Sequence, residues 1–97
     1  MNPFDLVKNM QNIQAQMKDM QGRLDSLRAV GSSGAGMVEI TVNGKMQVID
    51  LKISAEIVDP SDVKTLEALV AAAFNSAAQQ VQQILKDEAA TLAGRSI

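Results

Sequence analysis

The chain has 97 residues, with nine Lys and Arg against eleven Asp and Glu, so its formal charge is −2. This length suits one domain and is short for two. The acidic balance argues against the strongly basic profile of a dedicated nucleic-acid binder, so a polyanion would have to meet a local basic patch. Cys, His, Trp and Tyr are absent, which excludes thiolate nucleophiles, imidazole acid–base catalysis and the commonest zinc ligands.

A long helix is predicted over residues 1–30. Asn2 is a suitable N-cap, and Pro3 is tolerated in the first turn because its missing N–H has no helical partner there. Apolar side chains recur at alternating spacings of four and three and form one narrow seam, made of Leu6, Met10, Ile13, Met17, Met20, Leu24 and Leu27. Such a seam packs against another helix, which is either the chain's own second helix or a helix of a second copy.

Glycine and serine interrupt this helix at residues 31–36, Gly-Ser-Ser-Gly-Ala-Gly. A phosphate-binding loop of the P-loop type ends in Gly-Lys-Ser/Thr and connects a strand to a helix. Here a helix precedes the glycines and a strand follows them, so we do not expect nucleotide binding. The segment is expected to be a flexible connection or a short edge strand.

A small sheet is predicted over residues 31–58. The apolar period changes to two after Met37, and one side of this strand carries Val38, Ile40 and Val42. The Asn43-Gly44 pair favours a hairpin, with residues 45–54 returning as the partner strand. The apolar face of that strand is formed by Ile49, Leu51 and Ile53. Met46 and Val48 have the opposite parity, which predicts either a bulge or a face buried on both sides near the turn.

A second long helix is predicted over residues 59–93, with residues 94–97 as a tail. Asp59 is the expected N-cap, Pro60 the first helical residue, and Gly94 the stop. At about 1.5 Å per residue the helix is around 50 Å long, more than a domain of this size can cover. We therefore expect its far end to project as an arm and to pair with the first helix through a thin seam.

Nothing in the sequence predicts an enzyme, a bound metal, a cofactor or a small-molecule substrate. The closely spaced acids, Asp59 with Asp62 and Asp87 with Glu88, are explained by helix capping and solvation. The serines have no histidine to activate them. The N-terminus lacks the basic stretch of a secretion signal, and no apolar run is long enough to cross a membrane, so we expect a cytoplasmic protein.

Three features together resemble a known family. They are the long first helix, the segment 34–44 (Gly-Ala-Gly-Met-Val-Glu-Ile-Thr-Val-Asn-Gly), and the Asp59-Pro60 helix start followed by Leu-Glu-x-Leu-Val-x-Ala-Ala-x-Asn at 66–75. Over nearly the full chain they resemble the bacterial YbaB/EbfC family of nucleoid-associated proteins. The resemblance implies a single α+β domain over residues 1–97 with two layers, the order α-β-β-β-α and a three-stranded antiparallel sheet. The first strand would lie around Ala29 to Ser33.

The same resemblance implies a homodimer whose helices project as arms and grip double-stranded DNA. The family has no motif that identifies the DNA contacts, so these are predicted from charge. Basic residues concentrate on the first helix, where Lys8 and Lys18 lie off the apolar seam. We expect Lys8, Lys18, Lys86 and Arg95 to neutralise phosphates, with Lys45 and Lys64 as weaker candidates. Asp87 and Glu88 beside Lys86 would repel a duplex.

Two functions are therefore open. In the first, the protein is a homodimer in the nucleoid that binds double-stranded DNA, organises it and influences gene expression. In the second, the dimer is an adaptor whose exposed helix ends bind another protein, and its affinity for DNA is incidental. The dependence of DNA binding on salt separates the two.

Overall fold

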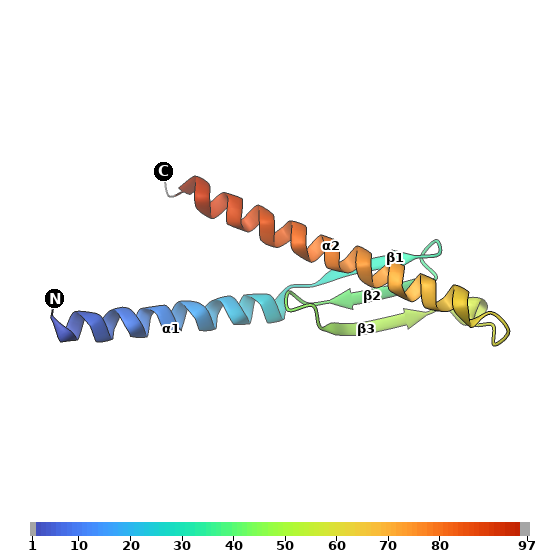
Figure 1. Ribbon diagram of the computed structural model, residues 1–97, viewed down its shortest axis with the longest axis horizontal. Helices are drawn as coiled ribbons and strands as arrows, with labels where there is room; N and C mark the ends of the chain where they lie inside the picture. Colours follow the sequence, from blue (N-terminus) through green and yellow to red (C-terminus); the bar gives the residue numbers. More distant parts are fainter. Residues whose placement is uncertain (1, 96–97) are drawn as a thin grey trace.

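The computed structural model describes the backbone of residues 2–95 and the side chains of residues 2–91. Helix α1 (Pro3–Ser26) is followed by the strands β1 (Ala29–Ser33), β2 (Val38–Val42) and β3 (Val48–Ile53), the short 3-10 helix η1 (Ala55–Ile57) and helix α2 (Val63–Arg95). The strands form one antiparallel sheet in the order β1-β2-β3. The expected α+β fold with the order α-β-β-β-α is confirmed (Figure 1).

The molecule is an open fork. Its dimensions are 70 × 26 × 17 Å and its radius of gyration is 19.7 Å, whereas a compact domain of about 100 residues has a radius of gyration near 13 Å. Both long helices extend beyond the same end of the sheet and diverge, so that the N-terminus and the end of α2 lie on the same side of the molecule (Figure 1). The fork is formed by the parts of α1 and α2 that extend beyond the sheet, because both helices are longer than the strands.

The core lies between α2 and one face of the sheet. Its buried members are small or β-branched: Ala29, Val38, Ile40, Val42, Ala73, Ala77 and Val81. Two hydrogen bonds fix α2 to β1, because the Ser33 hydroxyl donates to the Leu69 carbonyl at 2.5 Å and the Gln80 amide donates to the Val30 carbonyl at 2.7 Å. The two layers are therefore held together most closely over β1 and β2.

Helix α1 ends four residues earlier than the sequence predicts, at Ser26 instead of Val30. The Asn2 side chain caps its start as expected, with Oδ1 accepting from the Phe4 amide at 3.1 Å. Leu27 adopts an extended backbone, and the next residues pair with β2 as strand β1. The strand implied by the family resemblance at Ala29 to Ser33 is thus confirmed, because pairing and burial against α2 outweigh the helical pattern of the sequence.

The predicted hairpin and bulge are both present, but the turn is longer than the Asn-Gly pair alone implies. β3 begins at Val48, not Lys45, and residues 43–47 form the turn with Met46 in the left-handed region. Val42 pairs with Val48 and Thr41 pairs with Asp50, so Ile49 is the extra residue of the bulge. Leu51 and Ile53 lie opposite Ile40 and Val38 but stay exposed, because α2 covers β1 and β2.

The second helix begins at Val63, so the prediction of Asp59 as its N-cap is wrong. Asp59 instead organises a turn, accepting at Oδ1 from the amide and the hydroxyl of Ser61 at 2.9 and 2.7 Å. Asp62 takes the place before the helix, where its carboxylate accepts from the Thr65 amide and hydroxyl. Asp59 and Asp62 could each cap the start of the helix. The hydrogen bonds from Ser61 hold Asp59 in the turn before it, so Asp62 is the residue at the helix start. The helix also continues past Gly94, to Arg95.

Candidate nucleic-acid interface

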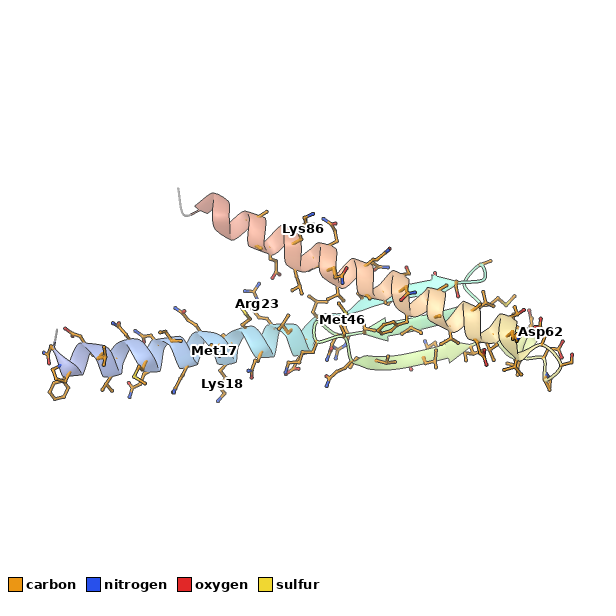
Figure 2. The ribbon with its side chains drawn as sticks, in the orientation of Figure 1. Met17, Lys18, Arg23, Met46, Asp62 and Lys86 are labelled. Carbon is orange, nitrogen blue, oxygen red and sulfur yellow. The ribbon has the colours of Figure 1, made fainter. Side chains whose placement is uncertain are left out.

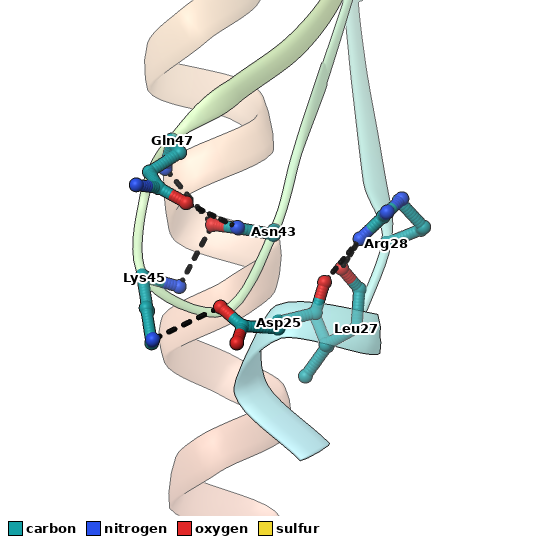
Figure 3. Close-up of polar contacts among 6 residues, drawn as sticks. All are labelled: Asp25, Leu27, Arg28, Asn43, Lys45 and Gln47. Carbon is teal, nitrogen blue, oxygen red and sulfur yellow. Dashed lines mark hydrogen bonds and ion pairs between the residues drawn. The ribbon is translucent and has the colours of Figure 1, made fainter. Parts of the chain in front are cut away.

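Helix α1 is attached to the rest of the chain only near its C-terminal end. The Gly44 amide donates to the Leu24 carbonyl at 2.8 Å, and Lys45 forms an ion pair with Asp25 at 3.0 Å. Arg28 donates to the carbonyls of Asp25 and Leu27 at 2.6 and 2.9 Å (Figure 3). The Gly44 amide and the Arg28 guanidinium group satisfy carbonyl groups that the end of a helix leaves without partners. The Gly44 and Lys45 contacts fix the base of α1 to the turn between β2 and β3.

The turn that receives α1 is organised by one buried side chain. Asn43 is 2% exposed, and its Oδ1 accepts from the amides of Lys45 and Gln47 at 2.9 and 3.0 Å. Its Nδ2 donates to the Gln47 side chain at 2.8 Å (Figure 3). A Cβ at Gly44 would lie 2.8 to 2.9 Å from atoms of Leu24, so only glycine permits this approach. The Asn43-Gly44 pair, predicted as a turn, therefore also positions α1.

Beyond this base, α1 projects with its apolar seam uncovered. All of α1 is described, and it contains no buried residue. Met10, Ile13, Met17 and Met20 are each 56–58% exposed. Near the base, Leu24 and Leu27 line a groove of about 390 Å³ whose opposite wall is Ile84 and Leu85 of α2. The seam thus meets the chain's own second helix only at the root of the fork, where the groove is apolar.

Lys8 and Lys18 lie on α1 away from the seam, and both are exposed. They are ten residues apart, or about 15 Å along the helix axis. Among the residues whose side chains are described, neither lysine forms an ion pair. The sequence prediction for their placement is confirmed: two free ammonium groups stand along the polar side of a projecting helix.

The cations predicted on α2 lie elsewhere. Lys86 is exposed on the side of α2 turned away from α1, whereas Lys18 lies on the side of α1 turned away from α2 (Figure 2). Arg95 is the last residue of α2, and its side chain lies outside the described residues. The structure therefore does not bring Lys86 together with Lys8 and Lys18 in one chain. The lysines occupy the outer sides of the fork and the apolar groove occupies its root.

The two weaker candidates for DNA contacts, Lys45 and Lys64, also lie apart from Lys8 and Lys18. Lys45 is engaged with Asp25 at 3.0 Å, so its charge is partly offset. Lys64 is exposed in the first turn of α2, at the end of the molecule opposite the tips of the fork. Neither lies beside the lysines of the arms.

Sequence reasoning assigned no role to Arg23. In the structure Arg23 Nη2 lies 3.2 Å from Glu88 Oε1, which joins α1 to α2 across the root of the fork. Figure 2 shows the Arg23 side chain directed toward α2. The two residues are far apart in the sequence, and neither belongs to a motif, so no local signal could have found the pair.

Within the described part of the chain, no group of three or more Asp and Glu side chains is placed to hold a metal ion. Nor does any helix there combine the length and apolar character required to cross a bilayer.

The whole chain was then compared with known proteins. The profile of the YbaB/EbfC DNA-binding family matches residues 1–96. The chain belongs to the YbaB/EbfC DNA-binding family. Among its relatives, a nucleoid-associated protein of Paramagnetospirillum magneticum is 41% identical over 93 residues, which cover 96% of this chain and 87% of the relative. A nucleoid-associated protein of Caldanaerobacter subterraneus is 37% identical, with coverages of 96% and 84%.

The fold has been seen in a solved structure. The crystal structure of an uncharacterized protein from Helicobacter pylori matches with a TM-score of 0.74 over 95% of this chain and 97% of that one. Its sequence identity is 20%, so the two chains share a fold.

Proposed function

We propose that this YbaB/EbfC chain binds double-stranded DNA as a homodimer, in which the outer lysines of its projecting helices contact the phosphate backbone. Membership of a DNA-binding family supplies the class of ligand. The observation that carries the proposal is the division of α1 into two sides, one apolar and one bearing Lys8 and Lys18. A duplex meets the lysines, and a protein surface covers the seam.

The uncovered apolar surface supports the presence of a second copy in the proposal. A projecting helix with a strict seam of two apolar residues in seven is stabilised by another helix in the manner of a coiled coil. β3 adds further exposed apolar side chains on the face that α2 leaves open, with Leu51 at 46% and Ile53 at 36% exposure. Covering both surfaces with a second copy also doubles the number of lysines that one DNA molecule can meet.

The sides of the fork determine where DNA would bind. The root of the fork is lined by Leu24, Leu27, Ile84 and Leu85 together with the Arg23–Glu88 ion pair, and Lys18 and Lys86 are directed away from it (Figure 2). A duplex held between α1 and α2 of one chain would meet mainly apolar side chains and a cation already paired with a carboxylate. We therefore assign DNA to the outer, lysine-bearing sides of the arms, and the arms that grip a duplex would belong to the homodimer and not to a single chain.

The cellular role that follows is coating or organising chromosomal DNA in the nucleoid, with an influence on gene expression. This matches the name of the relatives, nucleoid-associated protein. Contacts to phosphates position a protein on DNA without reading its sequence. With few lysines and a net charge of −2, binding is expected to be weak and to weaken further as salt increases.

A mobility-shift assay with a mixed-sequence duplex at low salt tests the proposal. The Lys8→Ala/Lys18→Ala double variant is expected to bind about tenfold or more weakly than the wild type, because each chain loses two phosphate contacts. The matched control is Lys52→Ala/Lys64→Ala, which removes the same charge from β3 and from the first turn of α2. Equal effects of the two double variants, or a wild type that fails to shift DNA, would overturn the assignment and favour the adaptor.

A further inference from the structure

The Arg23–Glu88 ion pair holds the one cation of α1 that lies next to α2. Its atoms are 3.2 Å apart, and the two side chains are 68% and 47% exposed. An ion pair this exposed is weak, because water and salt compete with it. Its carboxylate partner can therefore be exchanged for another anion without disturbing the fold.

The surroundings of Arg23 suit a phosphate. Arg23 lines a shallow hollow on α1 together with Lys18, Asp19, Gly22 and Ser26. Gly22 has no side chain, and the space beside its Cα is open, so a nucleic-acid strand could approach the helix backbone there. The charges of Lys18 and Asp19 offset each other, so Arg23 determines the net charge of the hollow.

We propose that Arg23 is a further contact for the DNA backbone and that Glu88 holds it back by competing with phosphate for the guanidinium group. This inference rests on the proposed DNA-binding function. Arginine binds phosphate through two parallel N–H donors and does so better than lysine. When DNA lies along the Lys8 and Lys18 side of α1, Arg23 leaves Glu88 and turns toward the hollow. The ion pair thus lowers the affinity for DNA, because Arg23 must leave Glu88 before it can bind a phosphate.

Neutralising Glu88 tests the proposal against an adjacent acid. Glu88→Gln and Asp87→Asn each remove one negative charge from the same turn of α2, but Asp87 accepts a hydrogen bond from Gln83 at 2.9 Å and does not pair with Arg23. We expect Glu88→Gln to bind a mixed-sequence duplex about three- to fivefold more tightly than the wild type, and to steepen the salt dependence by about one counterion per chain. Asp87→Asn is expected to give less than half of this gain.

A third variant shows whether Arg23 is the group released. In the Arg23→Gln background, Glu88→Gln should give no more gain than Asp87→Asn, since no guanidinium group is freed. Equal gains from Glu88→Gln and Asp87→Asn in the presence of Arg23 would overturn the inference while leaving salt-dependent wild-type binding, and so the proposed function, intact. A wild type that does not bind DNA at low salt would overturn both.

Discussion

At Gly31 the backbones of β1 and α2 approach each other closely. A Cβ built on it would overlap the carbonyl oxygen of Ala73 and the amide nitrogen of Ala77, both of which are backbone atoms that cannot turn aside. The small side chains of α2 at these positions are buried for the same reason. The glycine-rich segment, expected to be a flexible connection or a short edge strand, thus contains a packing contact.

Gly31→Ala is therefore expected to destabilise the fold by about 2–3 kcal/mol, because α2 must move off β1. Thermal unfolding followed by circular dichroism should show a Tm lower by roughly 10–20 °C. Gly22→Ala is the matched control: a Cβ there meets open space, and alanine favours a helix. A Gly31→Ala protein that unfolds at the wild-type Tm would contradict the close approach of β1 and α2.

The Asp59 carboxylate is held in a turn by Ser61. The Ser61 hydroxyl and amide donate to its carboxylate, and these hydrogen bonds lower its pKa below the ordinary value of 3.8. A group whose pKa is lower in the folded state stabilises that state above its unfolded pKa, and the contribution is lost as the pH falls through the folded value. The turn before α2 is thus more stable at neutral pH than below the ordinary carboxyl range.

Ser61→Ala removes the hydroxyl donor and keeps the backbone donor. We expect the pKa of Asp59, followed by NMR titration of its carboxyl carbon, to rise toward the ordinary value without reaching it. Ser32→Ala, an exposed serine of β1, is the control and should leave the Asp59 titration unchanged. An Asp59 pKa that is the same with and without the Ser61 hydroxyl would show that the bond is not formed in solution.

Among the elements, α1 carries the apolar seam that we expect a second copy of the chain to cover. Met17 lies on the seam and is 58% exposed, whereas Gln11 lies on the polar side. A carboxylate at position 17 would be buried without a partner in the dimer, and this is costly. We expect Met17→Glu to weaken the dimer at least about tenfold and Gln11→Glu to leave it unchanged.

Light scattering after gel filtration measures this effect. The wild type should have about twice the chain mass of 10.3 kDa, and Met17→Glu should approach the mass of one chain at low micromolar concentration. A wild-type monomer, or a dimer indifferent to the seam variant, would contradict the role given to α1.

The sequence predicts elements well where the pattern is long and regular. The heptad seam correctly predicts a long helix, and the alternation of Val38, Ile40 and Val42 correctly predicts the core side of β2. β1 has no such pattern, since its Gly and Ser residues favour loops, and it exists because β2 and α2 cover it. The start of α2 was placed too early because Asp59 and Asp62 are equivalent as caps in sequence, and only the hydrogen bonds to Ser61 distinguish them.

The candidate site was predictable to the same extent. Because a helix has a fixed period, the positions of the seam residues in the sequence are enough to place Lys8 and Lys18 on the opposite, polar side of α1. The direction of Lys86 relative to α1 depends on how the two helices diverge, which the sequence does not encode locally. The Arg23–Glu88 pair depends on the same divergence.

At the scale of the whole molecule, the fork explains how a chain of charge −2 can bind a polyanion. The lysines of α1 stand along a projecting helix, so a duplex can approach them without lying over the acidic groups of the sheet and of α2. The apolar root of the fork and the exposed side of β3 are left for a protein partner, which we take to be a second copy. In the proposed function, DNA binding and dimerisation would use different sides of the same helix.

The proposed contact of Lys8 and Lys18 with phosphates is tested most directly by the salt dependence of DNA binding. Fluorescence anisotropy of a labelled duplex, titrated at several salt concentrations, gives the slope of log K against log salt. Since each phosphate contact contributes about 0.9 to the slope, Lys8→Ala/Lys18→Ala should reduce it by about 2 for each bound chain, whereas Lys52→Ala/Lys64→Ala should not. A slope that is the same in the wild type and in the Lys8→Ala/Lys18→Ala variant would contradict the account.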